Sequence, residues 1–289
     1  MIHMKKNLSY HEVVKQYYPN AVYFDAFGQL VVDMMRAKGY PPEEVMLANS
    51  ICSDDVNAMQ FPPSLAKFLG PFNMGGLDGF PFTGITGMGA FSHHAPDDGI
   101  LMIFFAPHIG ISMKGYPKES VGKIQREGQK KLSDACGAVR AALNTVLSNQ
   151  VDPDTEIFIP KPAGPLDQQQ DTIVHILWEQ RERIRNSKKD PMIEATQIMY
   201  ENIYERLKLL LPKDGHHPEI ILVGGIYINV DADYNRPFFC FDENHRFEVI
   251  ELAGKKGKAK KVSGAEKLKT KNFAKELAKK IKAASAKSK

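Results

Sequence analysis

Three residues of this chain have the chemistry to hold a metal ion together: Cys52, His108 and Cys136. Cys52 directly follows one predicted strand, 44–51, and His108 lies two residues past another, 100–106. Side chains just beyond the carboxyl ends of parallel strands meet in one crevice of an open α/β sheet. A cysteine from a nearby helix would complete the set. Zinc favours thiolate and imidazole ligands, and three protein ligands leave a fourth position for water, which then loses a proton near neutral pH.

The spacing of these residues is a weak signal by itself. They lie 56 and 28 positions apart, and no C-x-x-C or H-x-x-H pair occurs among them. Cysteine is often simply buried, where it behaves as a small apolar residue. On spacing alone, two buried thiols and a hydrogen-bonded histidine are therefore the favoured interpretation.

Several sequence runs add information that the spacing lacks. ICSDDVN, GGLDGFPFTGITGMGAFSHHAPDDG, APHIGIS and the pair REGQ and CGA resemble the limiting-CO2-inducible protein B/C family, the θ-class carbonic anhydrases. The resemblance is strong over residues 45–142 and looser from there to residue 252. It implies a dimeric α/β domain with a fold similar to β-carbonic anhydrases, a zinc site of two cysteines and one histidine, and reversible hydration of CO2.

Matched by position, the resemblance implies that Cys52, His108 and Cys136 are the zinc ligands. It also implies that Asp54 accepts a hydrogen bond from the zinc-bound water and orients it toward CO2. In β-carbonic anhydrases this aspartate pairs with an arginine two residues further on, where this chain has Val56. The second cysteine also departs from the β-class pattern, in which it follows the histidine closely.

The arginine that pairs with Asp54 must therefore come from elsewhere in the chain. Arg126, in REGQ on an expected helix over 120–147, is the candidate, because a guanidinium fork can hold a carboxylate with two hydrogen bonds. Arg140 is the alternative. Without this restraint, Asp54 could itself bind the zinc and block the site.

His94, in the pair His93–His94, is a candidate proton relay because imidazole titrates near neutrality. The alternatives are that these rings cap the 96–99 turn or pack in the core, or that His94 joins Asp97 or Asp98 in a rival metal set. The glycines of 84–89 are interpreted as backbone that approaches the metal pocket. Four apolar residues are expected to form either the pocket wall or ordinary core: Phe80, Phe82, Met88 and Phe91.

The net charge of +4 hides an uneven distribution. Residues 255–289 contain fourteen lysines and two glutamates, a local charge of +12, so the preceding chain carries −8. Low hydrophobicity here predicts a disordered tail or a weak helix over 265–284. A solubilising role is favoured over binding of nucleic acid or an acidic partner, because aromatic residues for base stacking are nearly absent.

The rest of the pattern predicts an α/β class: a β-carbonic-anhydrase-like mixed sheet with a mainly parallel core flanked by helices. One zinc domain is expected over 1–254, with N-terminal helices at about 10–40 and a catalytic core at 45–252. The expected helices are 11–18, 24–38, 120–147, 171–186 and 191–211, and the expected strands are 44–51, 100–106, 219–230, 238–241 and 247–252.

Three cysteines without a visible secretory signal predict a reducing compartment, most simply the cytoplasm, with an organelle not excluded. No apolar window approaches the roughly 18–20 residues of a membrane span. The predicted function is thus a homodimeric, zinc-dependent carbonic anhydrase acting on CO2 and bicarbonate. The alternative is a catalytically silent, zinc-binding relative that serves as an inorganic-carbon sensor or scaffold.

Overall fold

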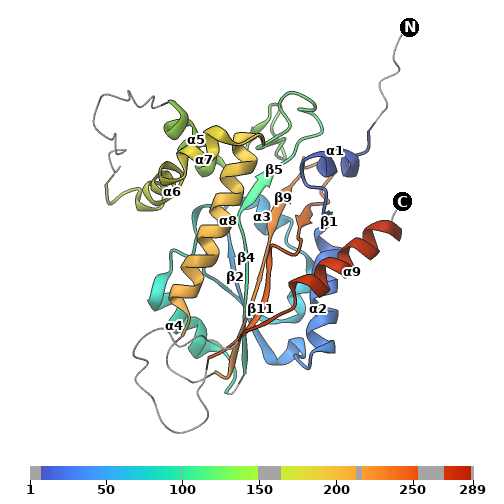
Figure 1. The fold of residues 1–289 in the computed structure, drawn as a ribbon, viewed down its shortest axis with the longest axis vertical. Helices are drawn as coiled ribbons and strands as arrows, with labels where there is room; N and C mark the ends of the chain where they lie inside the picture. Colours follow the sequence, from blue (N-terminus) through green and yellow to red (C-terminus); the bar gives the residue numbers. More distant parts are fainter. Residues whose placement is uncertain (1–7, 98, 149–163, 213–216, 253–269, 288–289) are drawn as a thin grey trace.

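The computed structural model describes residues 8–97, 99–148, 164–212, 217–252 and 270–287. Within these residues the chain forms a mixed α/β fold around a six-stranded sheet of order β12-β11-β8-β4-β2-β3 (Figure 1). The strands are β2 Val45–Ile51, β3 Leu69–Asn73, β4 Ile100–Ala106, β8 Glu219–Gly224, β11 Arg246–Glu251 and β12 Thr270–Asn272. The predicted fold class, a mixed sheet with a parallel centre, is confirmed.

The centre of this sheet consists of the parallel strands β2, β4 and β8. β2 and β4 are in register along their whole length, from Val45 opposite Ile100 to Ile51 opposite Ala106. Both faces of these strands are covered, so nearly every position is apolar, as in ILMIFFA of β4. Because the three strands run parallel, their carboxyl ends reach the same edge of the sheet. The segments that follow them can therefore share one site.

A second sheet, of order β1-β10-β9-β5, continues from that edge. Its strands are β1 Ala21–Tyr23, β5 His108–Gly110, β9 Ile226–Asn229 and β10 Phe238–Cys240. Pro107 separates β4 from β5, and Gly225 separates β8 from β9. A Cβ at Gly225 would lie only 2.5 Å from the Phe239 ring, so the bend requires glycine. The prediction of one strand over 219–230 was wrong because the chain passes from one sheet to the other here.

Helices cover both faces of the large sheet. They are α1 Tyr10–Tyr17, α2 Phe24–Ala37, α3 Asp55–Met59, α4 Gly84–His94, α5 Gly137–Ser148, α6 Gln168–Glu179, α7 Arg181–Asn186, α8 Pro191–Leu210 and α9 Ala274–Lys287. In Figure 1, α8 lies on the left of the strands and α2 on their right, so the two helices cover opposite faces of the sheet. Side chains alternate along β4 accordingly: Phe105 packs in the cluster on the α8 side, and Phe104 packs in the cluster on the α2 side. No described helix combines the length and apolarity needed to cross a membrane.

The helix predicted over 120–147 begins only at Gly137, and this prediction was wrong for the residues before it. They form a hairpin of β6 Lys123–Ile124 and β7 Ser133–Asp134. Gly122 and Gly128 have φ values of 74° and 73°, which a helix does not allow. Likewise, the predicted helix over 171–186 is two helices, α6 and α7, that meet at Gln180.

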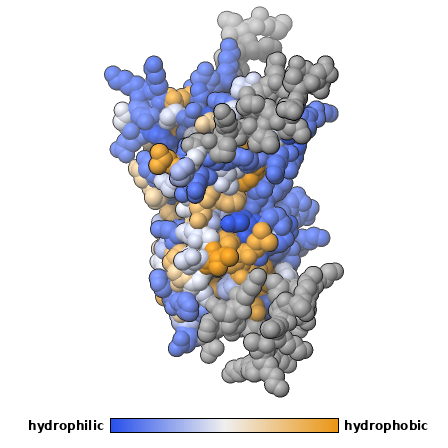
Figure 2. Space-filling view, turned by 90° about the vertical axis from the view of Figure 1, so that its left-hand side faces the viewer, coloured by the Kyte–Doolittle hydropathy of each residue, from blue (hydrophilic) through white to orange (hydrophobic). Residues whose placement is uncertain are grey.

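The glycine-rich residues 84–89 also differ from their prediction as pocket-lining backbone, because they form the first turns of α4. Figure 2 views the molecule from the left-hand side of Figure 1, where α4 lies. An apolar patch occupies the middle of this otherwise mostly hydrophilic face. Large apolar side chains that the structure leaves exposed include Leu69 of the edge strand β3 and Ile85 of α4.

The lysine-rich C-terminal segment is folded over 270–287, so of the two predicted alternatives, a disordered tail or a weak helix over 265–284, the structure has a helix from Ala274 onward. β12 pairs with β11, and α9 packs against α2. Four side chains of α9 are buried there: Ala274, Leu277, Ala278 and Ile281. Lys38 of α2 and Glu276 of α9 form an ion pair at 2.7 Å. Lys275, Lys279, Lys280 and Lys282 of α9 are exposed, and residues 253–269 lie outside the described residues.

Candidate metal centre

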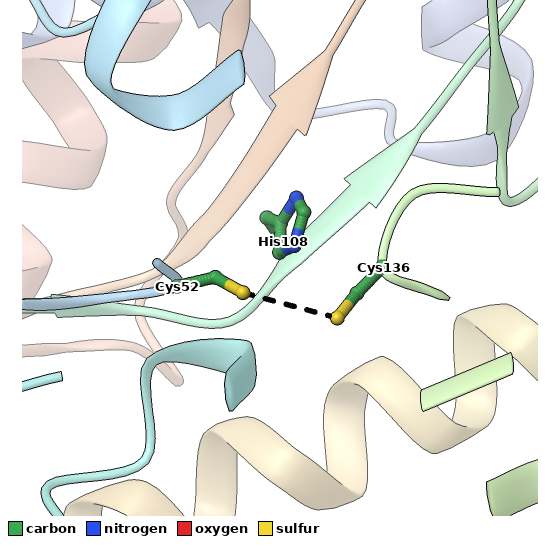
Figure 3. A group of neighbouring side chains, drawn as sticks. All are labelled: Cys52, His108 and Cys136. Atoms are coloured by element: carbon green, nitrogen blue, oxygen red, sulfur yellow. Dashed lines mark hydrogen bonds between the residues drawn. The ribbon is translucent and has the colours of Figure 1, made fainter. Parts of the chain in front are cut away.

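Cys52 is placed by the end of β2, which it follows directly. Its Sγ is buried and lies 4.0 Å from Sγ of Cys136 (Figure 3). The backbone N–H of Asp78 donates a hydrogen bond to the same Sγ at 3.1 Å. On the other side, Asn57 Nδ2 donates to the Cys52 carbonyl at 3.3 Å. The thiol is therefore held between two segments at the carboxyl edge of the sheet.

His108 is the first residue of β5 and is fully buried. Its backbone N–H donates to Asp78 Oδ1 at 3.2 Å, and its ring Nδ1 lies 2.6 Å from Asn229 Oδ1. The other ring nitrogen, Nε2, is buried without a hydrogen-bond partner among the described residues. An unpaired buried polar atom is costly and needs an explanation.

Asn229 determines which ring nitrogen of His108 carries the proton. Its Nδ2 donates to Asn57 Oδ1 at 3.1 Å and to Gln60 Oε1 at 3.3 Å, so its Oδ1 must face the imidazole as an acceptor. His108 therefore donates from Nδ1, so Nε2 is the ring nitrogen that can bind a metal once it has lost its proton. The parallel pairing of β5 with β9 brings these residues close.

Cys136 lies between the β6–β7 hairpin and α5. The hairpin is fastened to β5, because Gly110 N–H donates to the Ala135 carbonyl at 2.7 Å. The potential ligand atoms of Cys52, His108 and Cys136 all lie within 4.8 Å of one another. This is the one such group of His, Cys, Asp or Glu found among the described residues. The structure thus brings the three predicted ligands together in a buried site.

Asp54 lies two residues after Cys52 and faces Arg126. Both carboxylate oxygens accept hydrogen bonds from the guanidinium, Oδ1 from Nη1 and Oδ2 from Nη2, each at 2.7 Å. Asp54 Oδ1 also accepts the N–H of Val56 at 3.2 Å and so caps α3. Both side chains of the pair are mostly buried, with exposed fractions of 14% and 18%. The pairing follows the prediction, although Arg126 lies in the turn after β6 and not on a helix.

The Arg126 side chain is held along its length by the hairpin. Its Nε donates to Ser133 Oγ at 3.1 Å and its Nη2 to the Asp134 carbonyl at 3.3 Å. Arg140, the alternative partner of Asp54, instead lies 3.6 Å from the Asp134 carboxylate and donates to the Val121 carbonyl. The restraint on Asp54 is therefore Arg126.

In the absence of metal, the electrostatics of the site favour a negatively charged Cys52 beside a positively charged His108. The hydrogen bond with Cys136 lowers the pKa of Cys52 to about 4 despite burial, and the nearby His108 adds to this effect. The same hydrogen bond, together with burial, raises the pKa of Cys136 well above its ordinary range. Burial disfavours charged His108, yet Cys52 outweighs it and raises the His108 pKa to about 9. Burial likewise opposes ionisation of Asp54, but Arg126 holds its pKa at about 2.

Comparison with known proteins shows which family this chain belongs to. The sequence profile described as limiting CO2-inducible proteins B/C beta carbonic anhydrases matches residues 21–250, which include every residue of the site. The chain belongs to this family.

Solved structures of family members share the fold. The crystal structure of PtLCIB4, a homolog of the limiting CO2-inducible protein LCIB, is 28% identical, with a TM-score of 0.70 over 84% of this chain and 96% of that one. LCIB itself is 20% identical, with a TM-score of 0.59 over 85% and 96% of the two chains, and supports the fold alone. A search of curated proteins found no match. Membership in the LCIB/C family suggests a carbonic-anhydrase-like function, and the Cys52–His108–Cys136 group could bind a metal.

Asp78 and Asn229 also contact the candidate metal ligands, and both were missed at the sequence level. Asp78 is fully buried at a φ of 51° and contacts both Cys52 and His108 through its N–H and Oδ1. Burial raises its pKa to about 8. The signals available were an aspartate inside the glycine-rich GGLDGF run and, for Asn229, an amide at the end of the apolar strand IYIN.

His94 is not brought to the other site residues. It is exposed in the last turn of α4, where its ring contacts Phe72 at 5.6 Å between centroids. α4 leads into the amino end of β4, whereas Cys52 and His108 follow the carboxyl ends of β2 and β4 (Figure 1). Of the rival metal set with His94, Asp98 lies outside the described residues.

Proposed function

We propose that this chain is a zinc-dependent carbonic anhydrase that catalyses the reversible hydration of CO2 to bicarbonate. The observation that carries the proposal is the environment of His108. Asn229 holds its Nδ1, and its Nε2, which has no hydrogen-bond partner among the described residues, is buried beside the sulfurs of Cys52 and Cys136. Family membership supplies the chemical class of the reaction.

The residues present fit a zinc ion. Two thiolates and one imidazole match the ligands zinc prefers and leave one position for a non-protein ligand. Coordination would give His108 Nε2 the partner that no described residue provides, and two thiolates would balance the dication. When bound, zinc supplies Lewis acidity, which brings the pKa of water toward neutrality and so provides a nucleophile for CO2.

Asp54 would orient this water, and Arg126 would keep the carboxylate in place. The guanidinium holds both oxygens of Asp54, so the carboxylate cannot turn toward the metal without breaking two charge-assisted hydrogen bonds. Carboxylate oxygens have further lone pairs, and these can accept a proton-bearing partner. The pair thereby supports an open fourth position.

A small apolar cluster adjoins these polar groups. Val56, Ile124 and Ala135 are buried against one another, and each is within two residues of Asp54, Arg126 or Cys136. Val56 occupies the position where β-class enzymes have the arginine. An apolar wall beside the nucleophile suits CO2, which has no net dipole, and excludes bulk water.

Stopped-flow CO2 hydration on protein of measured zinc content tests the proposal. We expect activity in the presence of one zinc per chain and loss of both metal and activity in His108→Ala. His94→Ala is the matched control, since His94 is exposed on α4, and it should keep zinc and rate. Stoichiometric zinc without activity between about pH 6 and 9 would instead support the sensor or scaffold alternative. Retention of zinc by His108→Ala would refute the ligand set.

We further infer a homodimer in a reducing compartment such as the cytoplasm. The apolar patch on the α4 face supports a self-interface, because large apolar patches on a surface commonly mark contacts. All three cysteines are free thiols. Light scattering after size exclusion tests the first inference, and Ile85→Glu should shift the chain toward monomer if the patch is the interface.

A further inference from the structure

We propose that Asp231 is a positioning residue that fixes Arg126 through the backbone of Gln125 and so keeps Asp54 off the metal. The inference rests on the proposed function, because it concerns the fourth position of the metal. None of the comparisons assigns Asp231 a role, and it lies far from the metal ligands in sequence.

Asp231 and the residue after it hold the backbone of Gln125. Asp231 follows β9 after one residue and is 1% exposed. Its Oδ1 accepts the backbone N–H of Gln125 at 2.7 Å. In return, the Gln125 carbonyl accepts the N–H of Ala232 at 2.9 Å. Both peptide groups of Gln125 are therefore fastened to the segment that follows β9.

Arg126 directly follows Gln125 in the chain. An arginine side chain has many rotamers, and a two-pronged hydrogen bond to a carboxylate requires its Cα to be placed closely. The clamp at Gln125 sets the position of the backbone, and Ser133 and the Asp134 carbonyl set the direction of the side chain. Asp231 thus supports the Asp54–Arg126 pair without touching it.

The two carboxylate oxygens of Asp231 accept hydrogen bonds from different segments. The other oxygen of Asp231, Oδ2, accepts hydrogen bonds from Ser112 Oγ at 3.1 Å, Met113 N–H at 3.0 Å and Lys114 N–H at 3.3 Å. It also lies 3.1 Å from the Tyr10 hydroxyl. Oδ2 therefore holds the 112–114 loop, whereas Oδ1 holds Gln125. The two tasks fall on different atoms and can be separated by mutation.

Asp231→Asn removes the Gln125 contact selectively. The amide has one acceptor oxygen, which should face the three donors of the 112–114 loop. Its NH2 then faces the Gln125 N–H, and two donors cannot bond. Ser112→Ala is the matched control, because it removes one donor to Oδ2 and leaves the contact between Oδ1 and Gln125 intact.

The measurement uses the full chain loaded with Co²⁺ and titrated with thiocyanate, whose binding at the metal changes the visible absorption. We expect Asp231→Asn to weaken thiocyanate binding by about tenfold or more, because a freed Asp54 competes for the metal. Ser112→Ala should bind within about twofold of wild type. Adding Asp54→Ala to Asp231→Asn should restore the affinity, because the competitor is gone.

Unchanged thiocyanate affinity in folded Asp231→Asn would overturn this inference alone, as would an equal loss in Ser112→Ala. If wild type binds neither Co²⁺ nor thiocyanate, the proposed function fails, and this inference fails with it. Circular dichroism checks that Asp231→Asn folds. If it does not, Gln125→Pro removes the same N–H and should weaken thiocyanate binding in the same way, whereas unchanged affinity would refute the role.

Discussion

Asp54 and Arg126, 72 positions apart in the chain, meet with both carboxylate oxygens 2.7 Å from guanidinium nitrogens. In the β class the aspartate is expected to pair with an arginine two residues further on, where this chain has Val56. Here the arginine that pairs with Asp54 comes from a distant segment of the chain. The hairpin that carries Arg126 also leads into Cys136. One continuous segment thus provides both a cysteine of the candidate metal site and the arginine that pairs with the aspartate.

Replacing Arg126 by alanine should lower kcat/KM for CO2 hydration by about a hundredfold, since Asp54 loses its orientation and becomes free to bind the metal. Arg126→Lys should lose less, because it keeps the charge but not the fork. Stopped-flow assays with zinc content measured in parallel test this. Arg185→Ala, on the surface of α7, is the control. Wild-type rates in Arg126→Ala would contradict the assigned role.

Asn229→Leu should weaken zinc binding by about 10- to 100-fold, since His108 loses the acceptor that fixes its tautomer. Asn229→Asp keeps an acceptor oxygen and should bind zinc more tightly than Asn229→Leu. Competition with a chromophoric chelator measures both affinities. Asn202→Ala, whose amide donates to the Ile198 carbonyl within α8, is the control and should match wild type. Equal zinc affinities for Asn229→Leu and wild type would refute the orienting role.

Zinc uptake near pH 7 should release about two protons per ion. Without metal, the pKa of about 4 for Cys52 means that its thiol is already ionised at this pH. His108, with a pKa raised to about 9, and Cys136, whose pKa is also raised, both hold protons that coordination must displace. Release should therefore decrease as pH rises through about 9. Calorimetry in buffers of different ionisation enthalpy counts the protons, and a count of zero at pH 7 would contradict the pairing of charges.

Leu277→Ala should destabilise the protein by about 2–4 kcal/mol, because this α9 side chain is fully buried. Leu209→Ala removes the same atoms from a side chain that is 71% exposed and should cost far less. Chemical denaturation measures both. CO2 hydration below the unfolding transition should be unchanged in either variant. Similar stabilities for the two variants would show that α9 does not contribute to the fold as described.

The sequence predicted the elements whose signal is local. β4 has the predicted bounds because ILMIFFA is a continuous apolar run, and the family-like runs around Cys52, His108 and Cys136 identified the three residues that the structure brings together. The 120–136 segment was mispredicted as helix because its conformation depends on glycines with positive φ and on bonds to β5. Asn229 and Asp231 act through hydrogen bonds that span 121 and 106 positions. Local patterns contain no record of such contacts.

The tail shows a different limit. Its lysines and alanines have the composition of a disordered segment, so disorder and a weak helix over 265–284 both remained possible, and the structure has the helix α9. The stability of this helix comes from α2, some 240 positions earlier. The composition of residues 255–289 contains no information about α2, the helix against which α9 packs.

The bending of β8 into β9 has a consequence for biosynthesis. A ribosome delivers Cys52, His108 and Cys136 first. Asn229, which orients His108, and Asp231, which anchors Arg126, emerge only about ninety residues after the last ligand. A nascent chain therefore has all three ligands before it can fix the imidazole or anchor the arginine. We expect correct metal loading to be a late, post-translational event, and a chain truncated before residue 226 to bind zinc weakly and with little selectivity.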